Sequence, residues 1–329
     1  MTFDVPTDRR KPPQLSAVTF AAGLLPTASL SQDTWEKEEA VPAPYPQPTV
    51  DARFPAEIAP GVFVLPDRRV PLVPNVGIVV GSERVLVIDC GLGIDSAEAV
   101  LDTARRLAPG REIVLTLTHA HPERGFSAQV FYNEAQAGHL ARSGQGLLDG
   151  FRAGVLPLEH QFLLDGIRIT PPDETCGGIE TRIDLGGREV VLRSIGFARS
   201  SGDQIVEVPD AGVLFAGDLI EERTYPIVPY FPPLIGAEDI DLPAWRAALD
   251  AIENLGPSII VPGHGGLGGV EIARNVRGYL GALEDVAAGG SDMEAMIAEM
   301  RRRYPTLGAA ELHPARAAVP DALRLRERD

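Results

Sequence analysis

Residues 115–125 hold a group of side chains that can do chemistry. The stretch reads Leu-Thr-Leu-Thr-His-Ala-His-Pro-Glu-Arg-Gly, so an apolar run ends in His119, His121 and Glu123 at alternating positions. The tip of a strand can deliver several ligands into one cavity in this way, which is typical of a metal site. Arg124 follows directly, and its guanidinium is a permanent cation without a lone pair for a metal. The stretch is therefore a working metal centre, a reduced one or the remnant of one.

Three further motifs follow predicted strands later in the chain. They are Gly-Phe-Ala-Arg-Ser-Ser-Gly-Asp at 196–203, Phe-Ala-Gly-Asp-Leu at 215–219 and Val-Pro-Gly-His-Gly at 261–265. Because each comes where a strand ends, all four motifs can converge at one edge of a layered fold.

Together, in this order and spacing, the motifs resemble the metallo-β-lactamase superfamily over residues 60–288. Its pattern is H-x-H-x-D-H, then a G-H-T-x-G-D loop, then G-D at a strand end, then P-G-H. The resemblance implies metal ligands at His119, His121, Asp218 and His264, with Asp218 bridging two metals. It also implies an αββα sandwich of the α/β class.

Departures from this pattern reduce the expected metal content. Glu123 replaces an aspartate, while Arg124 and Arg199 stand where the pattern has histidines. A guanidinium about 4 Å from a divalent ion costs roughly 8 kcal/mol at an effective dielectric constant of about 20. We therefore expect at most one divalent metal, zinc or iron, or none. Glu123, Arg124, Arg199 and Asp218 are the candidate catalytic residues, with the arginines either paired to carboxylates or bound to an anionic substrate.

Three functions remain open on this basis. The first is a hydrolase with a reduced site that acts on an ester, thioester, lactone or related small molecule. The second is a metal-independent cyclase, lyase or isomerase that uses Arg124, Arg199 and Glu123. The third is a non-catalytic binding protein on the same fold.

An aromatic, proline-rich segment follows Asp218. Its residues Tyr225, Tyr230 and Phe231 predict a rigid loop that lines a substrate pocket or covers the edge of a sheet. An apolar or aromatic small-molecule substrate would suit such a lining.

The elements that must position these residues alternate between strands and helices. Helices are predicted at 95–108, at 243–255 and within 270–303, where Gly289-Gly290 interrupts the pattern. Strands are predicted at 61–65, 75–80, 84–89, 113–118, 167–170, 180–185, 189–194, 204–208, 212–216 and 258–261. Two strand-rich halves with flanking helices predict two packed sheets with helices outside.

Composition limits the partners and the organisation of the 329-residue chain. A formal net charge of -16 argues against nucleic-acid binding, and no apolar run is long enough for a membrane span. Residues 1–55 predict an extended proline-rich arm, 56–288 the main domain, and 289–329 a helical segment with a tail. Apolar residues in the arm predict that it packs either on its own domain or on a second subunit, which would make a homodimer. Two cysteines fit a reducing cytoplasm, although Arg9-Arg10 before an apolar stretch leaves export open.

Overall fold

A computed structural model describes residues 46–307, except for 126–130, 170–173, 227–239 and 291. These described residues belong to one compact unit. Among them, no helix is long and apolar enough to cross a membrane.

The first sheet has seven strands in sequential order. Its first four strands pair antiparallel, and the pairs from β4 to β7 are parallel. The strands are β1 (Ala56–Ala59), β2 (Val62–Leu65), β3 (Val76–Val80), β4 (Arg84–Ile88), β5 (Glu112–Thr116), β6 (Phe131–Asn133) and β7 (Glu174–Cys176).

The second sheet has five strands in the order β12-β11-β10-β9-β8. Strands β11 and β12 pair parallel, and the other neighbours pair antiparallel. The strands are β8 (Glu180–Asp184), β9 (Glu189–Gly196), β10 (Asp203–Val208), β11 (Val213–Glu221) and β12 (Ile259–His264).

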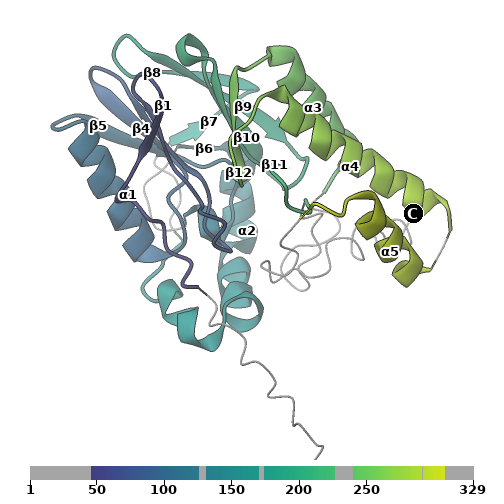
Figure 1. The fold of residues 1–329 in the computed structure, drawn as a ribbon. Coiled ribbons are helices and arrows are strands. Elements are labelled where there is room, and N and C mark those ends of the chain that lie inside the picture. Colours follow the sequence, from purple (N-terminus) through teal and green to yellow (C-terminus); the bar gives the residue numbers. More distant parts are fainter. Residues whose placement is uncertain (1–45, 126–130, 170–173, 227–239, 291, 308–329) are drawn as a thin grey trace, which may run out of the picture. The chain divides into compact units, whose positions relative to one another are not determined.

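Helices cover the outer faces of the two sheets (Figure 1). Helices α1 (Gly93–Leu107) and α2 (Glu134–Gly150) share an apolar core with the first sheet. Helices α3 (Leu242–Leu255) and α4 (Val270–Ala288) share another with the second sheet, and α5 (Met293–Arg303) follows α4. A third core lies between the sheets. This arrangement confirms the αββα sandwich.

Strand β4 shows how the sequence produces these layers. Val85 and Val87 belong to the core under the helices, whereas Leu86 and Ile88 belong to the core between the sheets. Successive side chains of a strand point to opposite faces, so a continuous apolar run is required where both faces are covered.

Two strand predictions differ most from the structure, while the other predicted strands differ at their ends by at most three residues. The predicted strand 167–170 is wrong over 167–169, where there is no strand, and Thr170 lies outside the described residues. Ile167 is buried in the first core and Ile169 lies against Gly144 of α2, so this apolar spacing reflects docking onto a helix. The second difference is β11, which continues to Glu221, five residues beyond the predicted end, so that Asp218 lies within the strand.

The segment just before β1 packs on α1. Val50 is buried and its N–H donates to Ser96 Oγ at 3.3 Å, and the carbonyl of Ala52 accepts a hydrogen bond from Thr103 Oγ1 at 3.0 Å. Residues 1–45 of the predicted arm and 308–329 of the predicted tail lie outside the described residues.

Candidate metal centre

Strands from both sheets bring the predicted residues to one site. His119 and His121 follow β5 of the first sheet, and Glu123 and Arg124 lie on the short helical turn Pro122–Arg124. From the second sheet, β11 carries Asp218. Residues far apart in sequence therefore meet because β5 and β11 belong to facing layers.

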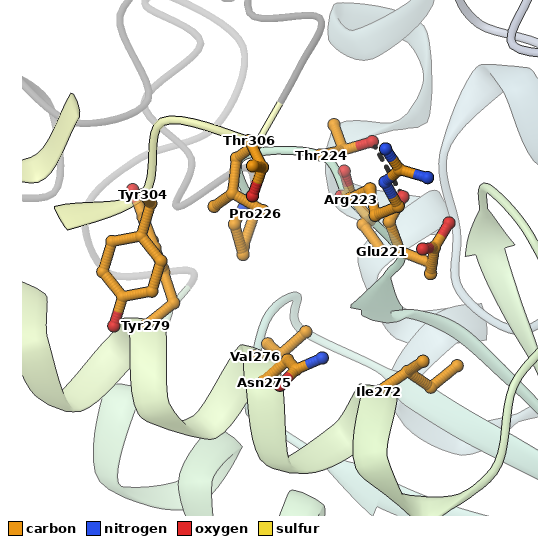
Figure 2. A pocket seen from close by; sticks show the side chains of 12 residues that line it. Glu221, Arg223, Thr224, Pro226, Ile272, Asn275, Val276, Tyr279, Tyr304 and Thr306 are labelled. Atoms are coloured by element: carbon orange, nitrogen blue, oxygen red, sulfur yellow. Dashed lines mark hydrogen bonds between the residues drawn. The ribbon is translucent and has the colours of Figure 1, made fainter. Parts of the chain in front are cut away.

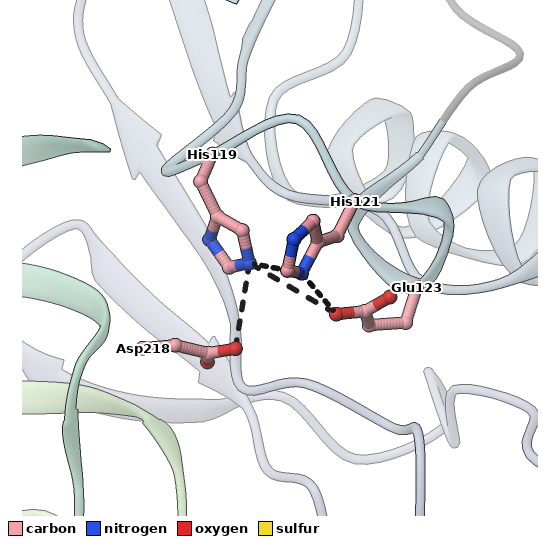
Figure 3. A group of neighbouring side chains, drawn as sticks. All are labelled: His119, His121, Glu123 and Asp218. Atoms are coloured by element: carbon pink, nitrogen blue, oxygen red, sulfur yellow. Dashed lines mark hydrogen bonds and ion pairs between the residues drawn. The ribbon is translucent and has the colours of Figure 1, made fainter. Parts of the chain in front are cut away.

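Four ligand atoms form a tight group. One atom from each of His119, His121, Glu123 and Asp218 lies within 4.8 Å of the others (Figure 3). His119 Nε2 is 3.1 Å from His121 Nδ1 and 3.4 Å from Asp218 Oδ2, and His121 Nδ1 is 3.2 Å from Glu123 Oε1. Tetrahedral zinc with bonds of about 2.1 Å requires ligand atoms about 3.4 Å apart. The spacing fits a single metal ion.

Arg124 lies beside this group and is completely buried. Its Nη2 donates to Asp218 Oδ1 and, at 3.0 Å, to His264 Nε2, while its Nη1 is 3.4 Å from Asp89 Oδ2. The guanidinium thus occupies the space between Asp218 and His264, which are two of the expected metal ligands. His264 Nε2 is 3.7 Å from Asp218 Oδ1.

Arg199 contacts the group from the loop between β9 and β10, and it is also buried. Its Nη2 is 3.0 Å from Asp218 Oδ2, and its Nη1 is 3.2 Å from His121 Nδ1 and 3.4 Å from His119 Nε2. Asp203 holds this loop, because its Oδ2 accepts the backbone N–H of Arg199 at 2.7 Å. Asp218 is therefore held by one guanidinium on each of its two oxygens.

The protonation states are set by burial and by the neighbouring charges. Burial lowers the pKa of His119 to about 3, so its ring is neutral and can donate a lone pair. Burial alone would raise the pKa of Glu123, but His121, His119 and Arg124 together hold it below its usual range. In Asp218, burial is likewise outweighed by Arg124 and Arg199, which keep its pKa well below the ordinary value. Both carboxylates are ionised at neutral pH.

Glu123 retains an unused acceptor. Among the described residues, its buried Oε2 has no hydrogen-bond partner, whereas its other oxygen, Oε1, contacts His119 and His121. A buried acceptor without a partner is costly, so a cation beside it would be stabilising.

Asp89 connects Arg124 to the first histidine. Its Oδ1 accepts the N–H of Thr118 at 2.8 Å, its Oδ2 accepts the Thr118 hydroxyl at 2.9 Å, and Thr118 Oγ1 is 3.2 Å from His119 Nδ1. Burial raises the pKa of Asp89 to about 6, against the opposing effect of Arg124. These contacts orient the His119 ring toward Asp218.

Sequence reasoning missed Glu221. This carboxylate is buried at the end of β11, and its Oε1 is 3.8 Å from Arg199 Nη2. Its position three residues after Asp218 could have indicated a place near the site. The predicted strand 212–216 ended before both residues, so this proximity was not recognised. Of the expected aromatic pocket residues, Tyr225 donates its hydroxyl to the Tyr304 carbonyl at 3.2 Å. Tyr230 and Phe231 lie outside the described residues.

Comparisons with known proteins support the layered fold and the family that the order of the motifs indicates. A sequence model of the metallo-beta-lactamase superfamily matches residues 69–264. No curated protein matches the sequence.

Solved structures share the fold at low sequence identity. A metallo-beta-lactamase from Pontibacter korlensis is 18% identical, with a TM-score of 0.52 over 69% of this chain and 98% of its own. A metallo-beta-lactamase family protein from Thermus thermophilus is 20% identical, with a TM-score of 0.55 over 83% of this chain and 95% of that one. The sec-alkylsulfatase Pisa1 from Pseudomonas sp. is 15% identical, with a TM-score of 0.55 over 83% of this chain and 50% of that one.

Proposed function

The chain belongs to the metallo-beta-lactamase superfamily, and we propose that it is an enzyme that binds one divalent metal ion and hydrolyses an ester, thioester, lactone or related small molecule. One observation carries this proposal: four ligand atoms of His119, His121, Glu123 and Asp218 lie within 4.8 Å of one another in a buried site. Two imidazoles and two carboxylates suit zinc or iron. A divalent ion so held supplies Lewis acidity and lowers the pKa of a water molecule.

Arg124 limits the site to one metal. Its guanidinium already bonds Asp218 and His264, the residues that would hold a second ion. It also contacts Asp89, so the charge of a second cation is replaced by a permanent side-chain charge. Arg124 therefore keeps Asp218 ionised and fixed in position.

Arg199 has two carboxylates within reach. It contacts Asp218 at 3.0 Å and Glu221 at 3.8 Å. Because its Nη1 also lies against the ring nitrogens of both histidines, metal binding requires this guanidinium to shift away from them. Glu221 offers the ion pair toward which it shifts, and from there Arg199 can stabilise negative charge that develops on a substrate.

Metal content and hydrolysis, measured together, test the proposal. Protein purified without chelator should contain about one zinc or iron per chain and hydrolyse at least one member of a panel of 4-nitrophenyl esters, thioesters and lactones. Chelation should abolish hydrolysis and metal should restore it. His121→Ala should lose both properties, whereas His160→Ala, which changes a buried histidine outside the site, should keep them. Less than about 0.2 metal per chain, with no activity after addition of zinc, iron or manganese, would refute the proposal.

A metal-independent cyclase, lyase or isomerase is the second candidate, and the position of Arg199 favours it. Arg199 Nη1 lies 3.2 and 3.4 Å from the two imidazole nitrogens, so the guanidinium itself can take the place of the first cation. In that case Arg199→Lys, which retains the positive charge but not the planar set of N–H donors, should lower turnover sharply. Chelators should have no effect on turnover by the unmutated protein.

A further inference from the structure

A cavity lies near the candidate metal centre. It has a volume of about 240 Å³ and lies between the end of β11, helix α4 and the segment after α5 (Figure 2). Glu221 lines it and is also 3.8 Å from Arg199 Nη2, which contacts Asp218. A molecule in this cavity is therefore separated from the metal ligands by one buried ion pair.

The two ends of the cavity differ in chemistry. Figure 2 shows Tyr279 and Tyr304 at one end, Arg223 and Glu221 at the other, and Val276 of α4 between them. This volume is slightly below the roughly 300 Å³ at which ligand pockets in proteins usually begin, so only a small molecule fits. The dimensions suit a short aryl or alkyl group attached to a polar head.

Arg223 determines the charge of that head. It is an exposed arginine, and no described residue forms an ion pair with it, whereas the adjacent Glu222 is paired with Arg69. Its φ angle of 55° is in the left-handed region, which bulky residues rarely adopt and which is often found at functional sites. Since Glu221 faces Arg199 and Glu222 is paired with Arg69, Arg223 is the charge at this end that remains for an anion.

Tyr279 lies at the other end of the cavity. Its side chain is 1% exposed, and its hydroxyl has no hydrogen-bond partner among the described residues. The neighbouring tyrosines differ, because Tyr304 donates to the Gly278 carbonyl and Tyr225 to the Tyr304 carbonyl. Because this hydroxyl oxygen is itself buried, Tyr279 contributes the surface of its ring to the lining of the cavity.

We infer that this cavity binds a carboxylate-bearing molecule with a short aryl or alkyl body, the carboxylate on Arg223 and the body against Val276 and the tyrosines. The inference rests on the proposed function in one respect: there, this molecule is the carboxylic acid that hydrolysis releases. Binding of a free acid does not require the hydrolytic step.

Calorimetric titration with 3-phenylpropionate and with its uncharged analogue 3-phenylpropan-1-ol tests the inference. Arg223→Asn removes the charge with a residue that tolerates a left-handed backbone, and it should weaken acid binding at least tenfold while changing alcohol binding less than twofold. The matched control is Arg68→Asn, because Arg68 is also exposed, has a φ angle of 51° and does not line the cavity. Val276→Phe fills the cavity and should abolish binding of both probes.

Titrations of metal-loaded and chelator-treated protein separate this inference from the proposed function. Acid binding that depends on Arg223 and Val276 in both preparations supports the cavity site, even if no ester is hydrolysed and the proposed function fails. The inference is overturned if the acid and the alcohol bind equally, if Val276→Phe leaves binding intact, or if neither probe binds, whatever the hydrolytic activity.

Discussion

Replacement of Arg124 by histidine should convert the site from one metal to two. Arg124 is completely buried and contacts Asp218, Asp89 and His264. Removal of one partner from a buried ion pair costs about 3–5 kcal/mol, because the remaining charges are left uncompensated. In the presence of chelator, the free energy of unfolding of Arg124→His should therefore fall by about 3–5 kcal/mol relative to the unmutated protein.

Zinc should reverse this loss in the variant. A metal at about 1,000 times its dissociation constant stabilises the folded state by about 4 kcal/mol. Because the unmutated protein gains one such increment and the variant two, the stabilisation by zinc should be about 4 kcal/mol larger in Arg124→His. Metal analysis should show about one additional ion per chain.

Urea unfolding followed by the fluorescence of the buried Trp245 measures these free energies, with and without zinc. Arg124→Met should show the same loss and gain from zinc only the single increment of the unmutated protein, and the exposed Arg246→His should change the free energy of unfolding by less than about 1 kcal/mol. The reasoning is refuted if Arg124→His binds no additional metal, or if Arg124→Met is as stable as the unmutated protein.

Two further predictions concern buried positions around the site. Burial raises the pKa of the Cys90 thiol to about 12, so iodoacetamide at pH 8 should modify Cys90 only after unfolding, and peptide mass spectrometry showing rapid modification of the native protein would contradict this. Gly217→Ala should destabilise the fold by about 2–4 kcal/mol, because a Cβ there would lie 2.6 Å from Thr118 Cβ at a φ angle of 54°. The control Gly256→Ala has a φ angle of 62° with no atom within 4 Å of the added Cβ, and equal losses in urea unfolding of the two variants would rule out the steric contribution.

Much of the fold could be predicted because its signals are local. The break between α4 and α5 at Gly289-Gly290 was predictable because glycine disfavours a helix. The buried strands were predictable from continuous apolar runs. The strand prediction failed over residues 167–169 because apolar residues that dock on a helix can have the same spacing as residues of a strand. The end of β11 was predicted too early because Gly-Asp is typical of a turn, yet here Gly217 lies within the strand and lets it approach Thr118.

The sequence by itself determined the residue types at the site and their order along the chain: three histidines, two carboxylates, and two arginines where the family pattern has histidines. Guanidinium chemistry alone excluded Arg124 and Arg199 as ligands. Only the tertiary structure decided what the arginines contact, since each reaches a different oxygen of Asp218 from another part of the chain. It likewise decided that Glu221 faces Arg199 and that a cavity begins there. Contacts of this kind depend on how distant strands pack and on which rotamers the packed layers allow, which no local pattern specifies.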